Sequence, residues 1–247
     1  MSARKTPQGD FRKILERISH HHDMRSVFDA FVRFAACALA AQTREAEYLE
    51  EAKRWDKADL DLFGQALGAL TLEMETKPFE DVLGTHYMEF ALSSKGRQWN
   101  GEFHTPKTVC DLMAQMVVGD LKSLPEEGPI TVCEPACGAG AMVLSIAQAC
   151  PPEVRRRLRI TAIDINRTAC DMAFVNTTLW GIPARIIHGN TISQEYWAAW
   201  SNIHYIAPWL PLALRFETPE AKEQGEPPKA AEVERINVSL KQQELAL

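Results

Sequence analysis

Apolar residues in the first third of the chain recur at the three- to four-residue spacing of an α-helix. The recurring positions are Val27, Phe28, Phe31, Val32, Phe34, Ala35, Tyr48, Leu49, Ala52, Leu60, Phe63, Leu67 and Leu70. Pro78 and Gly84 then interrupt the pattern, as these residues commonly do at the end of a helical segment. We therefore predict a helical N-terminal region over residues 24–98, packed on the rest of the protein or on a partner.

Residues 1–23 are mostly polar and end in Ser19-His20-His21-His22-Asp23. Adjacent histidines can bind a metal, but ligand histidines usually lie on one face and have acidic or cysteine neighbours. We interpret the run as a solvated turn and residues 1–23 as a flexible N-terminus.

The pattern changes near residue 100. Thr105-Pro106 predicts a helix start, with the Thr105 hydroxyl as N-cap and proline in the first turn. Apolar residues then recur on one face of this helix, and they are Val109, Leu112, Met113, Met116 and Val117.

Short apolar runs alternate with helical stretches after this helix. The predicted strands are Pro129–Cys133, Arg159–Ile163 and Ala184–Ile187, and the predicted helices are Ala141–Cys150 and Arg167–Trp180, the latter ended by Gly181. Strands and helices that alternate in this way form βαβ units and a parallel sheet. The predicted fold class is therefore α/β, with the sheet domain over residues 99–214. A charged C-terminal tail follows over residues 215–247, with an amphipathic helix in Lys229–Leu247 as one alternative for its end.

Composition adds limits on compartment and partners. The chain has 247 residues, of which 46% are hydrophobic, enough for one α/β domain with a helical appendage. No apolar run reaches the ~20 residues of a membrane helix, and the N-terminus lacks the apolar stretch of a secretory signal. We expect a cytoplasmic protein without membrane contact. The six cysteines include no CxxC pair, so we expect reduced thiols and no metal site.

The net charge of −6 and the pI of about 5.7 argue against a protein that binds DNA without a partner, because phosphate binding relies on lysine and arginine. A local basic surface or a basic partner could still supply DNA contacts. Arg155-Arg156-Arg157 with Arg159 is the one dense basic cluster. We favour an exposed loop face over a DNA contact for this cluster.

The sequence Glu134-Pro-Ala-Cys-Gly-Ala-Gly140 stands between a predicted strand and a predicted helix. Small residues there permit a tight turn and bring backbone N–H groups close to a ligand. A dinucleotide loop would need Gly or Ala at position 143, which is Val143. A phosphate loop would need a following Gly-Lys-Ser/Thr, which is absent. The acidic Glu134 favours a zwitterionic ligand with an ammonium group over a pyrophosphate.

Two further elements follow the next strands. Asp164, in Ala162-Ile-Asp-Ile165, can accept hydrogen bonds from both hydroxyls of a ribose, although an acidic residue at a strand end is also a common helix cap. Asn190, in His188-Gly-Asn-Thr191, carries an acceptor and a donor suited to the edge of an adenine. A plain Gly-Asn turn is an equal alternative there.

These elements together resemble a known family. Gly101-Glu-Phe-His-Thr-Pro106 is similar to the GxFxTP segment of type I restriction modification subunits and related γ-class N6-adenine DNA methyltransferases. The loop Glu134–Gly140 resembles their first S-adenosylmethionine (SAM) motif, (D/E)PACGxG, and residues 162–165 and 189–191 resemble the second and third motifs. Phe79–Met88 resembles the segment that leads into this core. The resemblance spans roughly residues 79–192.

The resemblance implies a Rossmann-like SAM-dependent methyltransferase sheet that transfers methyl groups to adenine N6 in DNA. Thr105 would hold the methionine carboxylate, Glu134 the amino-acid moiety, and Asp164 the ribose hydroxyls. Ile165 would lie against the adenine, and Asn190, where the family more often has Asp, would meet its amino group. The implied cofactor-binding residues are Phe103, Thr105, Pro106, Glu134, Pro135, Ala136, Cys137, Gly138, Gly140, Asp164, Ile165, Asn190 and Thr191. Implied partners are DNA, reached directly or through a partner subunit, and a specificity or homologous subunit.

The chain departs from the family at the catalytic motif. Family members have (Asn/Asp)-Pro-Pro-aromatic, which accepts hydrogen bonds from the flipped adenine. The nearest match is Ile206-Ala-Pro208-Trp209, in which Ile206 cannot accept a hydrogen bond. Pro208 and Trp209 are the only catalytic candidates, while Asn202 and Asn176 are poor substitutes. The first hypothesis is a DNA adenine methyltransferase, and the alternative is a catalytically inactive SAM-fold binding or regulatory module or one that needs a partner subunit.

Overall fold

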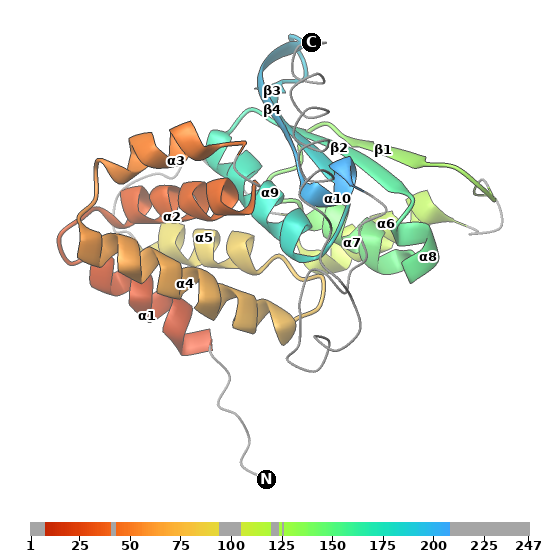
Figure 1. Cartoon of the computed structure of the whole chain (residues 1–247). Coiled ribbons are helices and arrows are strands. Elements are labelled where there is room, and N and C mark those ends of the chain that lie inside the picture. Colours follow the sequence, from red (N-terminus) through yellow and green to blue (C-terminus); the bar gives the residue numbers. More distant parts are fainter. Residues whose placement is uncertain (1–7, 41–42, 94–104, 120–123, 125, 208–247) are drawn as a thin grey trace, which may run out of the picture. The chain divides into compact units, whose positions relative to one another are not determined.

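The computed structural model describes residues 8–40, 43–93, 105–119, 124 and 126–207, which fall within one compact unit. Its helices are α1 (Gln8–Ile18), α2 (Met24–Leu39), α3 (Glu45–Ala52), α4 (Lys57–Glu75), α5 (Val82–Ser93), α6 (Lys107–Val118), α7 (Ala141–Ala149), α8 (Pro152–Arg155), α9 (Arg167–Leu179) and α10 (Ile203–Ile206). Its strands are β1 (Ile130–Glu134), β2 (Leu158–Asp164), β3 (Ala184–Asn190) and β4 (Glu195–Ser201). Figure 1 shows helices α1–α5 gathered beside the sheet.

Three parallel strands form the part of the sheet that the sequence predicts. The strand order is β1-β2-β3-β4, with β1, β2 and β3 parallel and in register, so that Asp164 pairs with His188. Helix α9 packs on β2 and β3, and α7 packs on α9 and α6. Alternate residues of β2, namely Leu158, Ile160 and Ala162, are fully buried. The predicted α/β fold with parallel βαβ units is confirmed, with element ends that differ by a few residues.

The N-terminal segment differs from its prediction. Residues 8–18 form α1, which packs along α4. The side chains of its Phe11, Leu15 and Ile18 are at most 1% exposed. The expectation of a flexible N-terminus is therefore wrong for residues 8–18, because three apolar residues on one helical face give that helix a place in the core. The predicted turn at His20–His22 is confirmed.

Strand β4 and helix α10 were not predicted. Strand β4 runs antiparallel to β3 and makes the sheet mixed, with a register shift between His188 and Gly189. At Gly189 the two strands approach so closely that a Cβ atom would lie 2.5 Å from the carbonyl oxygen of Glu195 and 2.8 Å from the Tyr196 ring. Only glycine fits there, so Gly189 allows β3 and β4 to pair as a hairpin.

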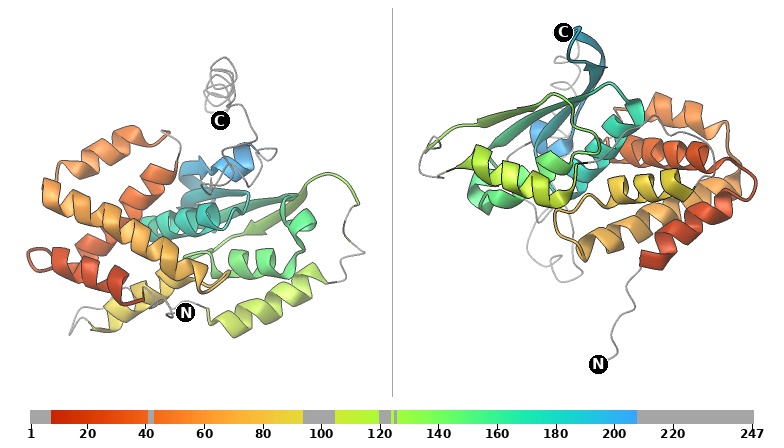
Figure 2. Two further views of the ribbon diagram at one scale, coloured as in Figure 1. Left: turned by 60° about the horizontal axis from the view of Figure 1, so that its bottom comes forward. Right: turned by 180° about the vertical axis from the view of Figure 1, so that it is seen from behind.

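Helix α6 buries fewer side chains than its pattern predicts. It begins at Lys107 with Pro106 at the N-cap position and no side-chain cap, so the predicted capping by Thr105 is wrong. Cys110 and Ala114 are buried, and α6 packs on α7. The five apolar residues of the predicted face are all 43–75% exposed, and they are Val109, Leu112, Met113, Met116 and Val117. Figure 2 shows α6 and β1 on the flank away from α1–α4.

No helix in the described part of the chain is both long and apolar enough to span a membrane. Within the same residues, no group of three or more histidine, cysteine, aspartate or glutamate side chains is arranged to hold a metal ion. The predicted helix at Lys229–Leu247 lies outside the described residues.

Candidate cofactor site at the carboxyl edge of the sheet

The loop between β1 and α7 turns through two left-handed glycines. Gly138 has φ +53° and Gly140 has φ +92°, a backbone region that L-residues with a side chain rarely adopt. The Cys137 N–H donates to the Ile163 carbonyl at 2.8 Å, and the Gly140 N–H donates to the Cys137 carbonyl at 2.8 Å. The loop is therefore held in one conformation against the end of β2.

Asp164 joins this loop to the second predicted element. Its Oδ2 accepts from the backbone N–H of Gly138 at 2.8 Å, and its Oδ1 accepts from the N–H of Asn166 at 2.8 Å. A carboxylate has about four lone-pair sites, so both oxygens can still accept further hydrogen bonds. The structure thus fixes the side chain beside the loop and leaves it capacity for the hydroxyls of a ribose.

Glu134 adds a second carboxylate to the same edge. Its side chain is half-buried, and its Oε1 accepts from the Ala136 N–H at 3.2 Å. Burial raises the pKa of Glu134, the hydrogen bond from Ala136 lowers it, and the negative charge of Asp164 raises it again. The negative charge that Asp164 adds beside Glu134 makes this edge attractive to a cationic group.

Residues after β2 and β3 complete the edge. Ile165 is 59% exposed directly after Asp164, and the Thr191 hydroxyl donates to the Pro135 carbonyl at 2.6 Å. The Asn190 Oδ1 accepts from the N–H groups of Ile192 and Ser193 at 2.9 and 3.2 Å. That oxygen is therefore used in a turn, which leaves the Asn190 amide nitrogen as the group able to face a ligand.

Thr105 and Pro106 line a separate pocket of about 330 Å³ next to the start of α7. Asp81, Thr85, Lys107, Ala141 and Ser145 also line it. Its acidic, hydroxyl and basic groups suit the ammonium and carboxylate of an amino acid, although Lys107 already pairs with Asp111 at 2.8 Å. Phe103, the remaining predicted cofactor residue, lies outside the described residues.

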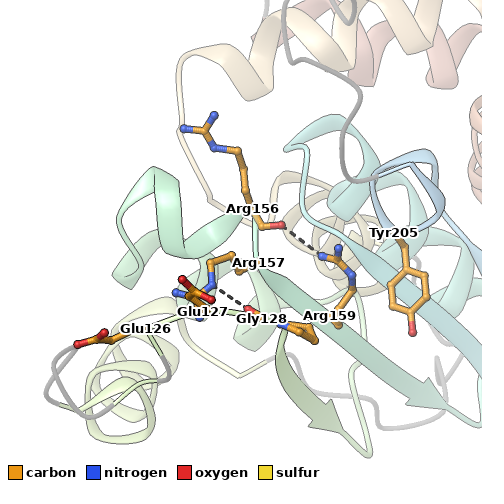
Figure 3. Close-up of a pocket in the computed structure, with 8 residues that line it drawn as sticks. Glu126, Glu127, Gly128, Arg156, Arg157, Arg159 and Tyr205 are labelled. Carbon is orange, nitrogen blue, oxygen red and sulfur yellow. Dashed lines mark hydrogen bonds between the residues drawn. The ribbon is translucent and has the colours of Figure 1, made fainter.

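Asn202 and Ile206, near or within the segment that resembles the catalytic motif, do not lie at this edge. Asn202 precedes α10, and its backbone N–H donates to the Ala184 carbonyl at the amino-terminal start of β3. Tyr205 lines a pocket with Pro129 and Arg159, at the amino-terminal ends of β1 and β2 (Figure 3). Ile206, which takes the place of the polar acceptor, therefore belongs to the end of the sheet opposite Glu134 and Asp164. Pro208 and Trp209 lie outside the described residues.

Asn176 is a supporting residue that the sequence did not reveal. Its Nδ2 donates to the carbonyl of Ala139 in the loop and to Oδ1 of Asp81, both at 2.9 Å, and the side chain is fully buried. It therefore connects the loop to the segment before α5. The available signal was a polar residue within the apolar face of the helix Arg167–Leu179.

His188 is the second residue that the sequence did not single out. Its Nε2 lies 3.2 Å from the Ile165 carbonyl, and its ring packs edge-on to Trp197 with the ring centroids 4.8 Å apart. Burial and then the positive charge of Arg167 lower the pKa of His188. Both effects favour the neutral imidazole over the charged one.

A glycine-turned loop that is hydrogen-bonded to an acidic strand end lies where open α/β sheets bind their ligands, outside the carboxyl ends of the strands. A family model for N-6 DNA methylases matches residues 79–235, and the chain belongs to this family. No curated protein sequence matches the chain.

Two solved structures are similar in fold. One is assigned to the class I S-adenosylmethionine-dependent methyltransferases and comes from Listeria monocytogenes, with 16% identity, a TM-score of 0.44, and coverage of 77% of this chain and 55% of that chain. The other is the methyltransferase subunit of a type I restriction-modification system from Streptococcus thermophilus, with 17% identity, a TM-score of 0.41, and coverage of 74% and 40%. The chain thus spans about half the length of these proteins.

Proposed function

We propose that the chain binds SAM along the carboxyl edge of β1–β3 and serves the N6-methylation of adenine in DNA. The proposal rests on the hydrogen bond from the Gly138 N–H to Asp164, because this bond joins residues of the first two predicted cofactor motifs. Membership of the N-6 DNA methylase family supports the choice of reaction.

The residues present fit this cofactor. Glu134 supplies negative charge for an ammonium group, Asp164 retains acceptors for ribose hydroxyls, and the exposed Ile165 offers an apolar surface for adenine. Asn190 would donate through its amide nitrogen to a ring nitrogen of the adenine, instead of accepting from the amino group. Bound SAM supplies an electrophilic methyl group.

The position of Ile206 favours dependence on a partner. A target adenine needs hydrogen-bond acceptors beside the transferred methyl group, and one such preorganised group contributes about 10²–10³ in rate in comparable sites. Ile206 offers no acceptor and belongs to the opposite end of the sheet. We therefore propose that a partner subunit contributes to base and DNA binding, and that the complex works in the cytoplasm.

Calorimetry with S-adenosylhomocysteine tests the cofactor site. We expect saturable heat with the native chain and at least a tenfold loss of affinity in Asp164→Ala, with Asp61→Ala, at an exposed position of α4, as the matched control. An absence of heat and of thermal stabilisation with both SAM and S-adenosylhomocysteine would exclude this function.

A labelled-methyl assay tests the partner requirement. We expect the pure chain to label adenine in DNA at or near background. Strong labelling by the pure chain would show that it carries its own base-binding groups.

A further inference from the structure

A second pocket lies at the amino-terminal edge of the sheet, away from the proposed cofactor site. It has a volume of about 720 Å³ and is lined by Glu126, Glu127, Gly128, Pro129, Arg156, Arg157, Arg159 and Tyr205. Apart from Tyr205 of α10, the pocket residues precede or begin β1 and β2, whereas Glu134 and Asp164 end these strands. The seven residues of β2 separate the two edges by about 20 Å at ~3.3 Å per residue, so one small ligand cannot occupy both.

Two arginines of this pocket, Arg156 and Arg159, are held by neutral groups. Arg159 donates from Nη1 to the carbonyls of Arg156 and Leu158 at 3.2 and 2.6 Å, and Arg156 donates from Nε to the Pro152 carbonyl at 3.2 Å. In the described part of the chain, neither guanidinium has a carboxylate within the 4 Å of an ion pair. Because carbonyls leave the charge of a guanidinium uncompensated, Arg156 and Arg159 retain donors and charge for an anion.

Arg155 belongs to the same run of arginines but has a structural role instead of lining the pocket. It donates to the carbonyls of Ala147 and Cys150 at 2.6 and 2.9 Å, and its guanidinium lies 4.3 Å from the centre of the Phe79 ring. Arg155 therefore anchors α8, whereas Arg156 and Arg159 line the pocket. Figure 3 shows Arg159 between Arg156 and Tyr205.

Tyr205 gives the pocket an aromatic wall. The side-chain oxygen of Asn202 accepts from the Tyr205 N–H at 3.0 Å and so fixes the short helix α10 that carries the ring. Pro129 adds apolar surface to the lining. Glu126 and Glu127 are exposed on the rim, and their charge weakens the attraction for a bare anion. A ligand that combines an anionic group with a planar ring suits this lining better than a free anion.

We propose that this pocket binds a nucleotide unit, with its phosphate on Arg156 and Arg159 and its base against Tyr205. Arginine matches phosphate geometry bidentately, and stacking of bases on aromatic rings is a common mode of single-strand binding. The ligand is either a free nucleotide or one unit of a nucleic-acid strand. The site is independent of the proposed cofactor site.

Fluorescence anisotropy of a labelled ten-residue oligothymidylate at low salt tests this proposal on the full chain. We expect Arg156→Gln/Arg159→Gln to weaken binding about tenfold or more and to flatten the salt dependence, since each lost phosphate contact removes about 0.7 from the slope for single strands. Tyr205→Leu, which keeps apolar bulk, should weaken binding without changing that slope. Glu126→Gln/Glu127→Gln should strengthen binding.

Two controls separate this site from general effects. The first is Arg54→Gln, which removes the positive charge of an arginine that pairs with Glu51 outside the pocket and should not weaken oligonucleotide binding. Thymidine monophosphate as competitor distinguishes the two sources, because displacement identifies a free nucleotide and its failure identifies a strand. Equal affinity of the double arginine variant and Arg54→Gln, or no binding of either ligand, would overturn the proposal.

Discussion

The backbone N–H of Gly138 lies 2.8 Å from Oδ2 of Asp164, although 26 residues separate the two positions. Asp164→Ala removes the acceptor for this N–H and for that of Asn166. We expect a loss of about 1–3 kcal/mol in the free energy of unfolding, because two backbone donors lose their partner. Urea denaturation measures it, and Asp61→Ala should stay within about 0.5 kcal/mol of the native chain. Equal stability of the two variants would contradict this role.

Cofactor affinity should depend on pH through Glu134. Burial raises the pKa of this carboxyl, and only its ionised form attracts an ammonium group. The affinity for S-adenosylhomocysteine should therefore rise as the pH increases through this raised pKa and then level off. Calorimetry across the acidic range measures the rise, and Glu134→Gln should bind more weakly with a flatter profile. An unchanged profile in that variant would assign the titration to another group.

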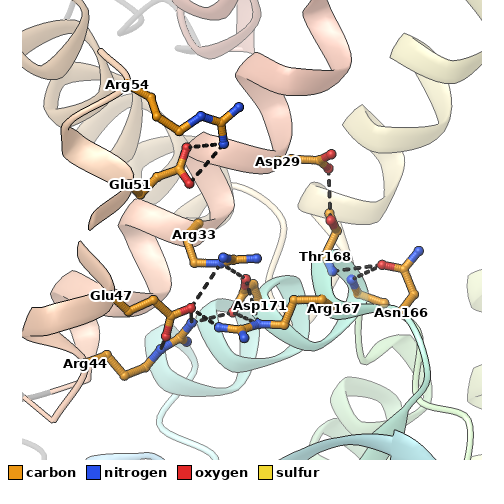
Figure 4. Close-up of polar contacts among 11 residues, drawn as sticks. Asp29, Arg33, Arg44, Glu47, Glu51, Arg54, Asn166, Arg167, Thr168 and Asp171 are labelled. Atoms are coloured by element: carbon orange, nitrogen blue, oxygen red, sulfur yellow. Dashed lines mark hydrogen bonds and ion pairs between the residues drawn. The ribbon is translucent and has the colours of Figure 1, made fainter. Parts of the chain in front are cut away.

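A buried ion cluster joins the helical region to the sheet (Figure 4). Asp171 of α9 is fully buried and accepts from Nη2 of Arg44 at 2.8 Å and from Nε of Arg33 at 2.6 Å. The side chain of Arg44 is only 2% exposed. Asp171→Ala would leave this guanidinium only the half-buried Glu47 as a carboxylate partner, so we expect a loss of about 3 kcal/mol in the free energy of unfolding, the low end for a broken buried pair.

A surface pair provides the control for this cluster. Glu50 and Lys53 pair with side chains that are 74% and 70% exposed. Exposed pairs contribute about 0–1 kcal/mol, and Glu50→Ala should therefore change the unfolding midpoint little. A similar loss in both variants would mean that burial does not set the strength of the Asp171 cluster.

The outer face of α6 should tolerate charge. Met116 is 75% exposed, whereas Leu144 of α7 is fully buried. Met116→Glu should change the free energy of unfolding by less than about 0.5 kcal/mol, and Leu144→Ala should cost about 2–5 kcal/mol. Thermal denaturation distinguishes them. A large loss in Met116→Glu, measured on dilute protein, would show that this face is covered in solution.

The sheet was predictable because its strands are short apolar runs separated by helices, and the loop because glycines stand where positive φ is needed. The sequence could not show that α6 leaves its apolar face exposed, since periodicity reports which residues share a face and not what covers them. Strand β4 was not predicted for two reasons. Polar and apolar residues do not alternate regularly in Glu195-Tyr-Trp-Ala-Ala-Trp-Ser201. No common hairpin turn sequence precedes it, and the positive φ of +60° in this turn is adopted by Gln194.

Chain order alone could not place residue 206. It follows the third motif at the sequence distance expected of the catalytic motif, but α10, which ends at Ile206, folds back to the amino-terminal end of β3. Pro208 and Trp209 lie outside the described residues. Ile206→Asn, which restores the polar residue of the family motif, should therefore leave methyl transfer to DNA unchanged. The labelled-methyl assay measures it, and a clear gain of adenine labelling would place residue 206 beside the cofactor after all.

The Asp171 cluster shows that the segment matched by the family model is shorter than the segment joined by buried ion pairs. The N-6 DNA methylase match begins at residue 79, yet Arg33 and Arg44, two of the three arginines that pair with Asp171, precede it. A fragment starting at residue 79 would keep every cofactor motif but would leave Asp171 only the longer pair with Arg167, at 3.4 Å. We therefore expect stable folding to need the helices before residue 79, even though they contribute no side chain to the proposed cofactor site.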